Sequence, residues 1–157
     1  MKKTIGILLL MVSFLIGFKH VLQAQSATYK PKPVLNHIAV YVVDLKLSTD
    51  FYTDIIHLDT IPEPFHDGRH TWFAIGPVGH LHIIQGAKEF TPHDKNNHLC
   101  FSVGSIIAFI KILNKNSISY EDWAGEKMKV TNRVDGVHQI YLKDPDGYWL
   151  EINDAKN

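Results

Sequence analysis

The chain is poor in cysteine and in net charge, and both shortages exclude classes of protein. Among 157 residues Cys100 is the single cysteine, which excludes an intramolecular disulfide and any Cys-x-x-Cys metal or redox site. Lys and Arg total 16 and so do Asp and Glu, so the basic surplus typical of nucleic-acid binders is missing. The 10 glycines and 7 prolines are too few for a collagen-like or low-complexity chain. This composition and length indicate one globular domain.

The long apolar run of the chain stands at its N-terminus. Residues 5–18 carry no charge, follow Lys2 and Lys3, and lead into small and polar residues, which is typical of a secretory signal peptide. Fourteen residues span only about 21 Å as a helix, less than the hydrocarbon core of about 30 Å. We predict a signal peptide at residues 1–24, cleaved near Ala24–Ser26, and export to the periplasm or the extracellular space. No stable membrane insertion is then expected after cleavage, and an uncleaved anchor remains the alternative.

The chain contains two copies of one pattern. The segment Leu-Asn-His-Ile-Ala-Val-Tyr-Val at 35–42 recurs as Asn-Asn-His-Leu-Cys-Phe-Ser-Val at 96–103, and both alternate as strands do. Asp44 and Ser105 stand as N-caps before two apolar helical faces. The extended segments that follow are 58–62, 71–75 and 80–85 in the first copy, and 120–123, 136–142 and 148–153 in the second.

These patterns predict an α+β fold of two βαβββ modules that form a cup-shaped, partly open mixed β-sheet with the helices outside. The predicted boundaries are an N-terminal linker at 25–34 and a single domain at 35–154, divided into module one at 35–87, a linker at 88–96 and module two at 97–154.

The chain is rich in histidine, with 10 residues, and histidine is the commonest metal ligand. Because strand side chains alternate between faces, four predicted strands each direct a metal-capable side chain away from the helices. These side chains are His37, His82, His98 and Glu151, and His80 shares a face with His82 and is an alternative to it. Three imidazoles and a carboxylate suit one divalent Zn, Ni, Co, Fe or Mn ion.

The opening strand at 35–40 and the Asp-Pro-Asp-Gly-Tyr-Trp-Leu-Glu segment at 144–151 resemble the vicinal oxygen chelate superfamily, which includes glyoxalase I, epimerases, fosfomycin-resistance proteins, extradiol dioxygenases and bleomycin-resistance proteins. The resemblance spans roughly 35–153. It implies metal ligands at the same four positions that alternation selects, with Glu151 also the catalytic base. His57 departs from the family, which commonly has Gly after the first helix.

The resemblance implies a metal-dependent lyase, isomerase or epimerase acting on a small substrate that is chelated through adjacent oxygens. A drug-binding module of the bleomycin-resistance type, a ring-cleaving dioxygenase and an inert relative stay open as alternatives. Two arrangements of the site also stay open: a homodimer in which two chains complete it, and a site completed within one chain. The candidate substrate-binding residues are Arg69, Tyr41, Cys100, Trp149 and Arg133. Because exported proteins lack the cytosolic supply of reduced glutathione, we expect a substrate other than a glutathione adduct.

Overall fold

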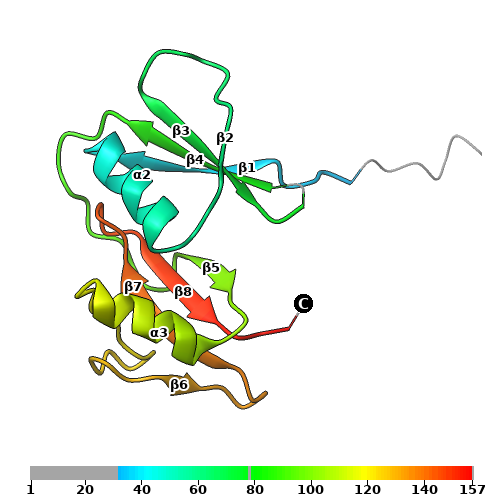
Figure 1. Ribbon diagram of the computed structural model, residues 1–157, viewed down its shortest axis with the longest axis vertical. Helices are drawn as coiled ribbons and strands as arrows, with labels where there is room; N and C mark the ends of the chain where they lie inside the picture. Colours follow the sequence, from blue (N-terminus) through cyan, green and yellow to red (C-terminus); the bar gives the residue numbers. More distant parts are fainter. Residues whose placement is uncertain (1–31, 78, 157) are drawn as a thin grey trace, which may run out of the picture. The chain divides into compact units, whose positions relative to one another are not determined.

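The computed structural model describes residues 32–77 and 79–156 (Figure 1). The predicted signal peptide at 1–24 lies outside the described residues, so its prediction stays untested. Every helix and strand described belongs to one compact unit, Leu35–Asn157. Among the described residues, no helix combines the length and apolar character needed to cross a membrane.

Each module forms its own four-stranded sheet with one helix. Module one consists of β1 (His37–Val42), α2 (Leu45–Asp54), β2 (Thr60–Ile61), β3 (His70–Ile75) and β4 (Gly79–Gln85). Module two consists of β5 (His98–Ser102), α3 (Ile106–Lys115), β6 (Thr131–Asn132), β7 (His138–Lys143) and β8 (Trp149–Asn153). The strand orders are β1-β4-β3-β2 and β5-β8-β7-β6, and the first pair of each sheet is parallel while the others are antiparallel. The predicted βαβββ repeat is confirmed, and neither sheet closes into a barrel.

Both helices begin at the predicted caps. The side chain of Asp44 accepts a hydrogen bond from the Leu47 amide at 2.9 Å, and Ser105 accepts one from the Ala108 amide at 3.2 Å. These bonds satisfy amides that have no partner inside the helix. After α2 the chain passes through His57 in the left-handed region, with φ of 63°, a conformation that favours glycine.

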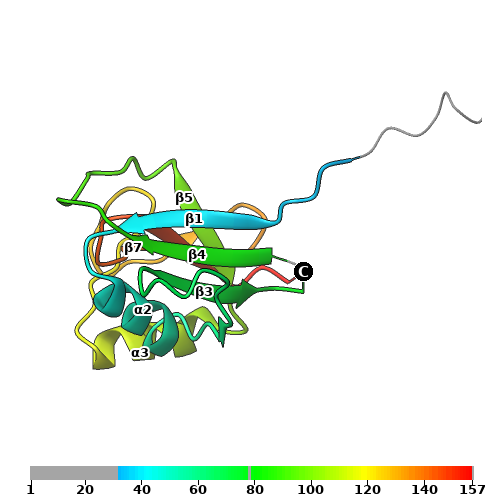
Figure 2. The same cartoon turned by 90° about the horizontal axis from the view of Figure 1, so that it is seen from above.

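The core lies on the helix-covered face of each sheet. Val40 and Val42 of β1, and Leu150 and Ile152 of β8, are almost fully buried, as their alternation predicts. Figure 2 shows α2 and α3 on the same side of the strands, so neither of these two described helices covers the opposite faces of the sheets.

One predicted strand is wrong. The segment 120–123 forms only isolated bridges, in which Glu121 pairs with Lys127 and with Tyr141. The fourth strand of the second sheet is instead the two-residue β6, which pairs with β7 and lies outside the extended segments predicted from the sequence. Two residues are too short for an alternating pattern to be visible in the sequence.

The turn between β7 and β8 ties module two to module one. Asp146 accepts hydrogen bonds from the Ser48 hydroxyl and the Val43 amide, both at 2.7 Å, and Asp144 accepts one from the Tyr52 hydroxyl at 2.9 Å. Both carboxylates are buried, so each bond replaces contact with water. The Asp-Pro-Asp-Gly segment therefore anchors the start of α2 as well as making a turn.

Candidate functional site

The faces of the two sheets that the helices leave uncovered carry the predicted metal-capable side chains. Residues opposite each other on neighbouring strands share a face. On module one this face combines His37, Ala39, Tyr41, His70, Trp72, Ala74, His80, His82 and Ile84. On module two it combines His98, Cys100, Ser102, Gln139, Tyr141, Lys143, Trp149, Glu151 and Asn153.

The strand register distinguishes His82 from His80. In module two His98 lies opposite Trp149, and Glu151 lies one step further along the same face, opposite Cys100. In module one His37 lies opposite His80, and His82 lies one step further, opposite Ala39. His82 is therefore the counterpart of Glu151, and His80 is the counterpart of Trp149.

In module one, His82 is enclosed by aromatic rings. It is 5% exposed and stacks on Trp72 with a centroid distance of 4.0 Å, while the His37 ring lies 5.9 Å away, edge-on. Burial and the neighbouring His70 and His37 lower the pKa of His82, so its neutral form, the form that binds metals, is favoured. His37 Nδ1 lies 2.8 Å from the Asn36 side-chain oxygen.

In module two, His98 and Glu151 lie side by side. His98 Nε2 is 3.4 Å from Glu151 Oε2, and His98 Nδ1 is 2.7 Å from the Lys95 carbonyl oxygen. Although burial acts to raise it, hydrogen bonds from Tyr141 at 2.6 Å and Asn153 at 2.9 Å bring the pKa of Glu151 below its usual value. Glu151 is therefore held as a carboxylate.

The two pairs remain separate within one chain. Among residues 32–77 and 79–156, no three His, Cys, Asp or Glu side chains are grouped closely enough to hold a metal ion. We call the His37–His82 and His98–Glu151 pairs two candidate half-sites, one on each sheet.

The donors of these half-sites fit a borderline divalent ion. Imidazole nitrogen and carboxylate oxygen suit Zn, Ni, Co, Fe or Mn. In His37 the Nδ1–H donates to an oxygen, which leaves the Nε2 lone pair available, as in histidines that bind metals. In His98 the Nδ1–H also faces an oxygen acceptor, and Nε2 faces the Glu151 carboxylate, the other candidate ligand of that sheet.

The predicted substrate-binding residues divide into two groups. Three lie near the module-two pair: Cys100 Sγ is 3.4 Å from Glu151, Arg133 lies 4.0 Å from the same carboxylate, and Trp149 lies beside Lys95. The other two have different partners. Arg69 donates to the Gln85 carbonyl oxygen, and the Tyr41 side chain is half exposed.

The prediction from sequence missed three side chains at these half-sites. His70 Nδ1 is 2.7 Å from His82 Nε2, Trp72 stacks on His82, and Tyr141 donates to Glu151. The Trp72 indole N–H is buried and has no hydrogen-bond partner within the described part of the chain. Alternation along β3 and β7 would have placed all three on the correct faces.

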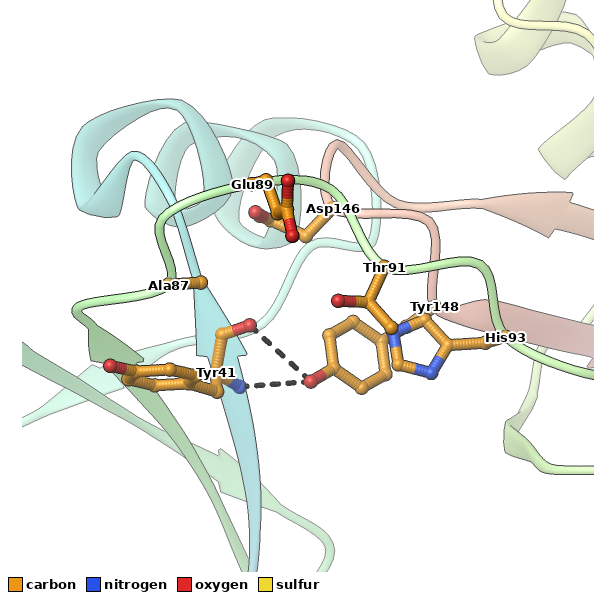
Figure 3. A pocket seen from close by; sticks show the side chains of 7 residues that line it. All are labelled: Tyr41, Ala87, Glu89, Thr91, His93, Asp146 and Tyr148. Atoms are coloured by element: carbon orange, nitrogen blue, oxygen red, sulfur yellow. Dashed lines mark hydrogen bonds between the residues drawn. The ribbon is translucent and has the colours of Figure 1, made fainter.

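Cavities lie next to these elements. One of about 140 Å³ is lined directly by His98 and Cys100. Another, of about 430 Å³, is bounded by Tyr141 and Trp149 together with Glu121, Lys127 and Lys143. A cavity of about 180 Å³ lies where the module linker meets β1. Figure 3 shows the Tyr148 hydroxyl directed at the Tyr41 backbone there, with the His93 ring stacked on Tyr148 at 3.9 Å.

The chain belongs to the Glyoxalase/Bleomycin resistance protein/Dioxygenase superfamily, whose family model matches residues 34–152. It is 26% identical over 152 residues to lactoylglutathione lyase of Pseudomonas putida, covering 76% of this chain and 83% of that protein. It is 27% identical over 125 residues to metallothiol transferase FosB of Staphylococcus epidermidis, covering 76% and 80%. The solved structure of oxidase ChaP-H2 matches with a TM-score of 0.66 at 24% identity, over 80% of this chain and 96% of that one.

Proposed function

We propose that this protein is an exported, metal-dependent enzyme, a glyoxalase-like lyase, isomerase or epimerase acting on a small substrate chelated through adjacent oxygens. The observation that carries the proposal is the matching register of the two modules. In that register, His37 and His82 occupy positions of the first sheet that correspond to those of His98 and Glu151 in the second. Relatives of the same superfamily that act as a lyase and a metallothiol transferase support enzymatic chemistry.

Each residue of the half-sites has a distinct part in this proposal. His37, His82, His98 and Glu151 would hold the ion, which supplies Lewis acidity that polarises a substrate carbonyl. Glu151, ionised and bonded to Tyr141, would accept a proton from the carbon beside that carbonyl. The Trp72 indole N–H, buried without an acceptor among the described residues, would donate to a substrate oxygen.

Two copies of the chain would complete the site. The two half-sites are separate in one chain, and each lies on a sheet face that the helices leave uncovered. We propose a homodimer in which module one of one copy faces module two of its partner. By two-fold symmetry such a dimer contains two metal sites, one ion per chain.

The substrate would be something other than a glutathione adduct. The proposal of export rests on the basic and apolar N-terminal residues, and an exported enzyme lacks the cytosolic glutathione pool. Robust turnover of the methylglyoxal–glutathione hemithioacetal would contradict this part of the proposal.

Metal content tests the proposed function. The full chain is expressed without a histidine tag and reconstituted in turn with Zn, Ni, Co, Fe and Mn, and bound metal is measured by mass spectrometry. We expect one ion per chain in the parent and at least about ten-fold weaker binding in His37→Ala and Glu151→Ala. His80→Ala, changed on the same face, is the matched control and should keep its metal. A parent that binds no near-stoichiometric metal would exclude the enzyme and favour a binding module.

A further inference from the structure

Three side chains, Asp67, His70 and His82, form a row of close polar contacts in module one. Asp67 Oδ2 lies 3.3 Å from His70 Nε2, and His70 Nδ1 lies 2.7 Å from His82 Nε2. The His70 side chain is 13% exposed, and the Phe65 ring lies over it at a centroid distance of 4.6 Å. Both nitrogens of His70 therefore have a partner, and one partner is a proposed metal ligand.

Proton counting along this row determines which nitrogen of His82 is free. An ionised carboxylate repels a nitrogen lone pair and attracts an N–H, so a neutral His70 ring is expected to carry its proton on Nε2, which faces Asp67 at 3.3 Å. A neutral imidazole carries one N–H, which leaves His70 Nδ1 as an acceptor. The proton in the 2.7 Å contact then belongs to His82 Nε2, and the His82 lone pair lies on Nδ1.

The packing of the His82 ring does not by itself determine which of its two nitrogens carries the proton. Stacking on Trp72, with 20° between the ring planes, fixes the plane of the His82 ring. A ring turned by 180° would stack equally well, because stacking does not distinguish the two nitrogens. The hydrogen bond to His70 is the contact that distinguishes them.

We propose that His70, anchored by Asp67, is a positioning residue that holds His82 in the Nε2–H tautomer and so presents Nδ1 of His82 to the metal. The statement that His82 binds a metal through Nδ1 rests on the proposed function. The tautomer of His82 is a property of the metal-free protein. His82 then differs from His37 and His98, whose Nδ1 atoms face oxygen acceptors and which present Nε2. The site would combine one Nδ1 ligand with two Nε2 ligands.

Nitrogen NMR of the imidazoles tests the tautomer directly. Long-range proton–nitrogen spectra of the full chain are recorded without metal at pH 8. We expect His82 protonated at Nε2 in the parent, and a mixture of tautomers in His70→Phe, which keeps an aromatic ring and removes the acceptor. His80→Phe changes a neighbouring histidine with no hydrogen bond to His82 and should leave the tautomer unchanged. A parent protonated at Nδ1, or a tautomer unaffected in His70→Phe, would overturn the inference.

Metal titration of the same proteins separates this inference from the proposed function. We expect His70→Phe to bind Zn about 10- to 100-fold more weakly than the parent, and His80→Phe to match the parent. Equal Zn affinity in His70→Phe and the parent would contradict the positioning role. A parent that shows the predicted tautomer but binds none of the tested metals would contradict the proposed function, while supporting the role of His70 in fixing the ring.

Discussion

At the scale of single residues, burial raises the pKa values of two side chains, Cys100 and Asp144. Desolvation and the neighbouring Glu151 carboxylate raise the pKa of Cys100 to about 12. Burial raises the pKa of Asp144 to about 6, against the opposing effect of the hydrogen bond from Tyr52. Cys100 lies in a half-site and Asp144 in the contact between modules, so each reports on a different part of the structure.

Cys100 should react slowly with thiol reagents, because its Sγ lies against Glu151 and Asn153 although part of the residue is exposed. At pH 8 a thiol with a pKa near 12 has about a thousand-fold less thiolate than free cysteine. We expect a correspondingly slow reaction of the metal-free protein with a disulfide reagent, and a faster one in Glu151→Gln, which removes the neighbouring charge. Reaction of the parent at the rate of free cysteine would show that the thiol is not held in this environment.

Asp144 should make stability depend on pH. Its pKa is higher in the folded protein than in the unfolded chain, so the folded state binds the proton more tightly. Its contribution to the free energy of unfolding is therefore greatest below about pH 4 and falls as the pH rises through about 6. Urea unfolding of the parent and Asp144→Asn is compared from pH 4 to 8. We expect the difference between them to change by about 2–3 kcal/mol across this range, and a constant difference would contradict the assignment.

Sequence patterns could identify the candidate ligands but not their immediate partners. Alternation placed His37, His82, His98 and Glu151 on open faces, yet it could not separate His82 from His80, because both occupy the same face of β4. That distinction needs the register between β1 and β4. His70 was not predicted because it precedes the extended segment predicted at 71–75, and its contact with His82 joins residues 12 apart in sequence.

At the scale of helices and strands, the elements that depend on contacts between residues close in sequence were the easiest to predict. Both N-caps and both helices follow from side chains that lie within a few residues of each other. The strands with an apolar face, such as β1 and β8, follow from alternation. The short β6 does not, because two residues pair with β7 only through contacts distant in sequence.

Loss of the cap on α2 should weaken the fold measurably. Asp44→Ala leaves the Leu47 amide without its side-chain acceptor, and we expect the free energy of unfolding to fall by about 1 kcal/mol. Asp44→Ser, which restores a capping oxygen, should recover most of this loss in urea unfolding. Equal stability of Asp44→Ala and the parent would show that the cap adds nothing.

At the scale of the whole molecule, duplication explains why the proposed site is divided. Each βαβββ module buries one face of its sheet under a helix and presents two donors on the other face. The turn carrying Asp144 and Asp146 binds the two modules of one chain together through α2. No group of three metal-capable side chains forms within the described residues, and in the proposed function a second copy of the chain therefore completes the set of four donors.

Complementation between two defective variants tests this central claim most directly. His37→Ala damages only the module-one half, and Glu151→Ala damages only the module-two half, so neither protein alone has an intact site. If sites form between copies, co-expression of the two variants gives mixed dimers with one intact site each, and metal binding should return to about a quarter of the parent value. If co-expressed variants bind no more metal than either variant alone, the site is not shared between copies and the account is wrong.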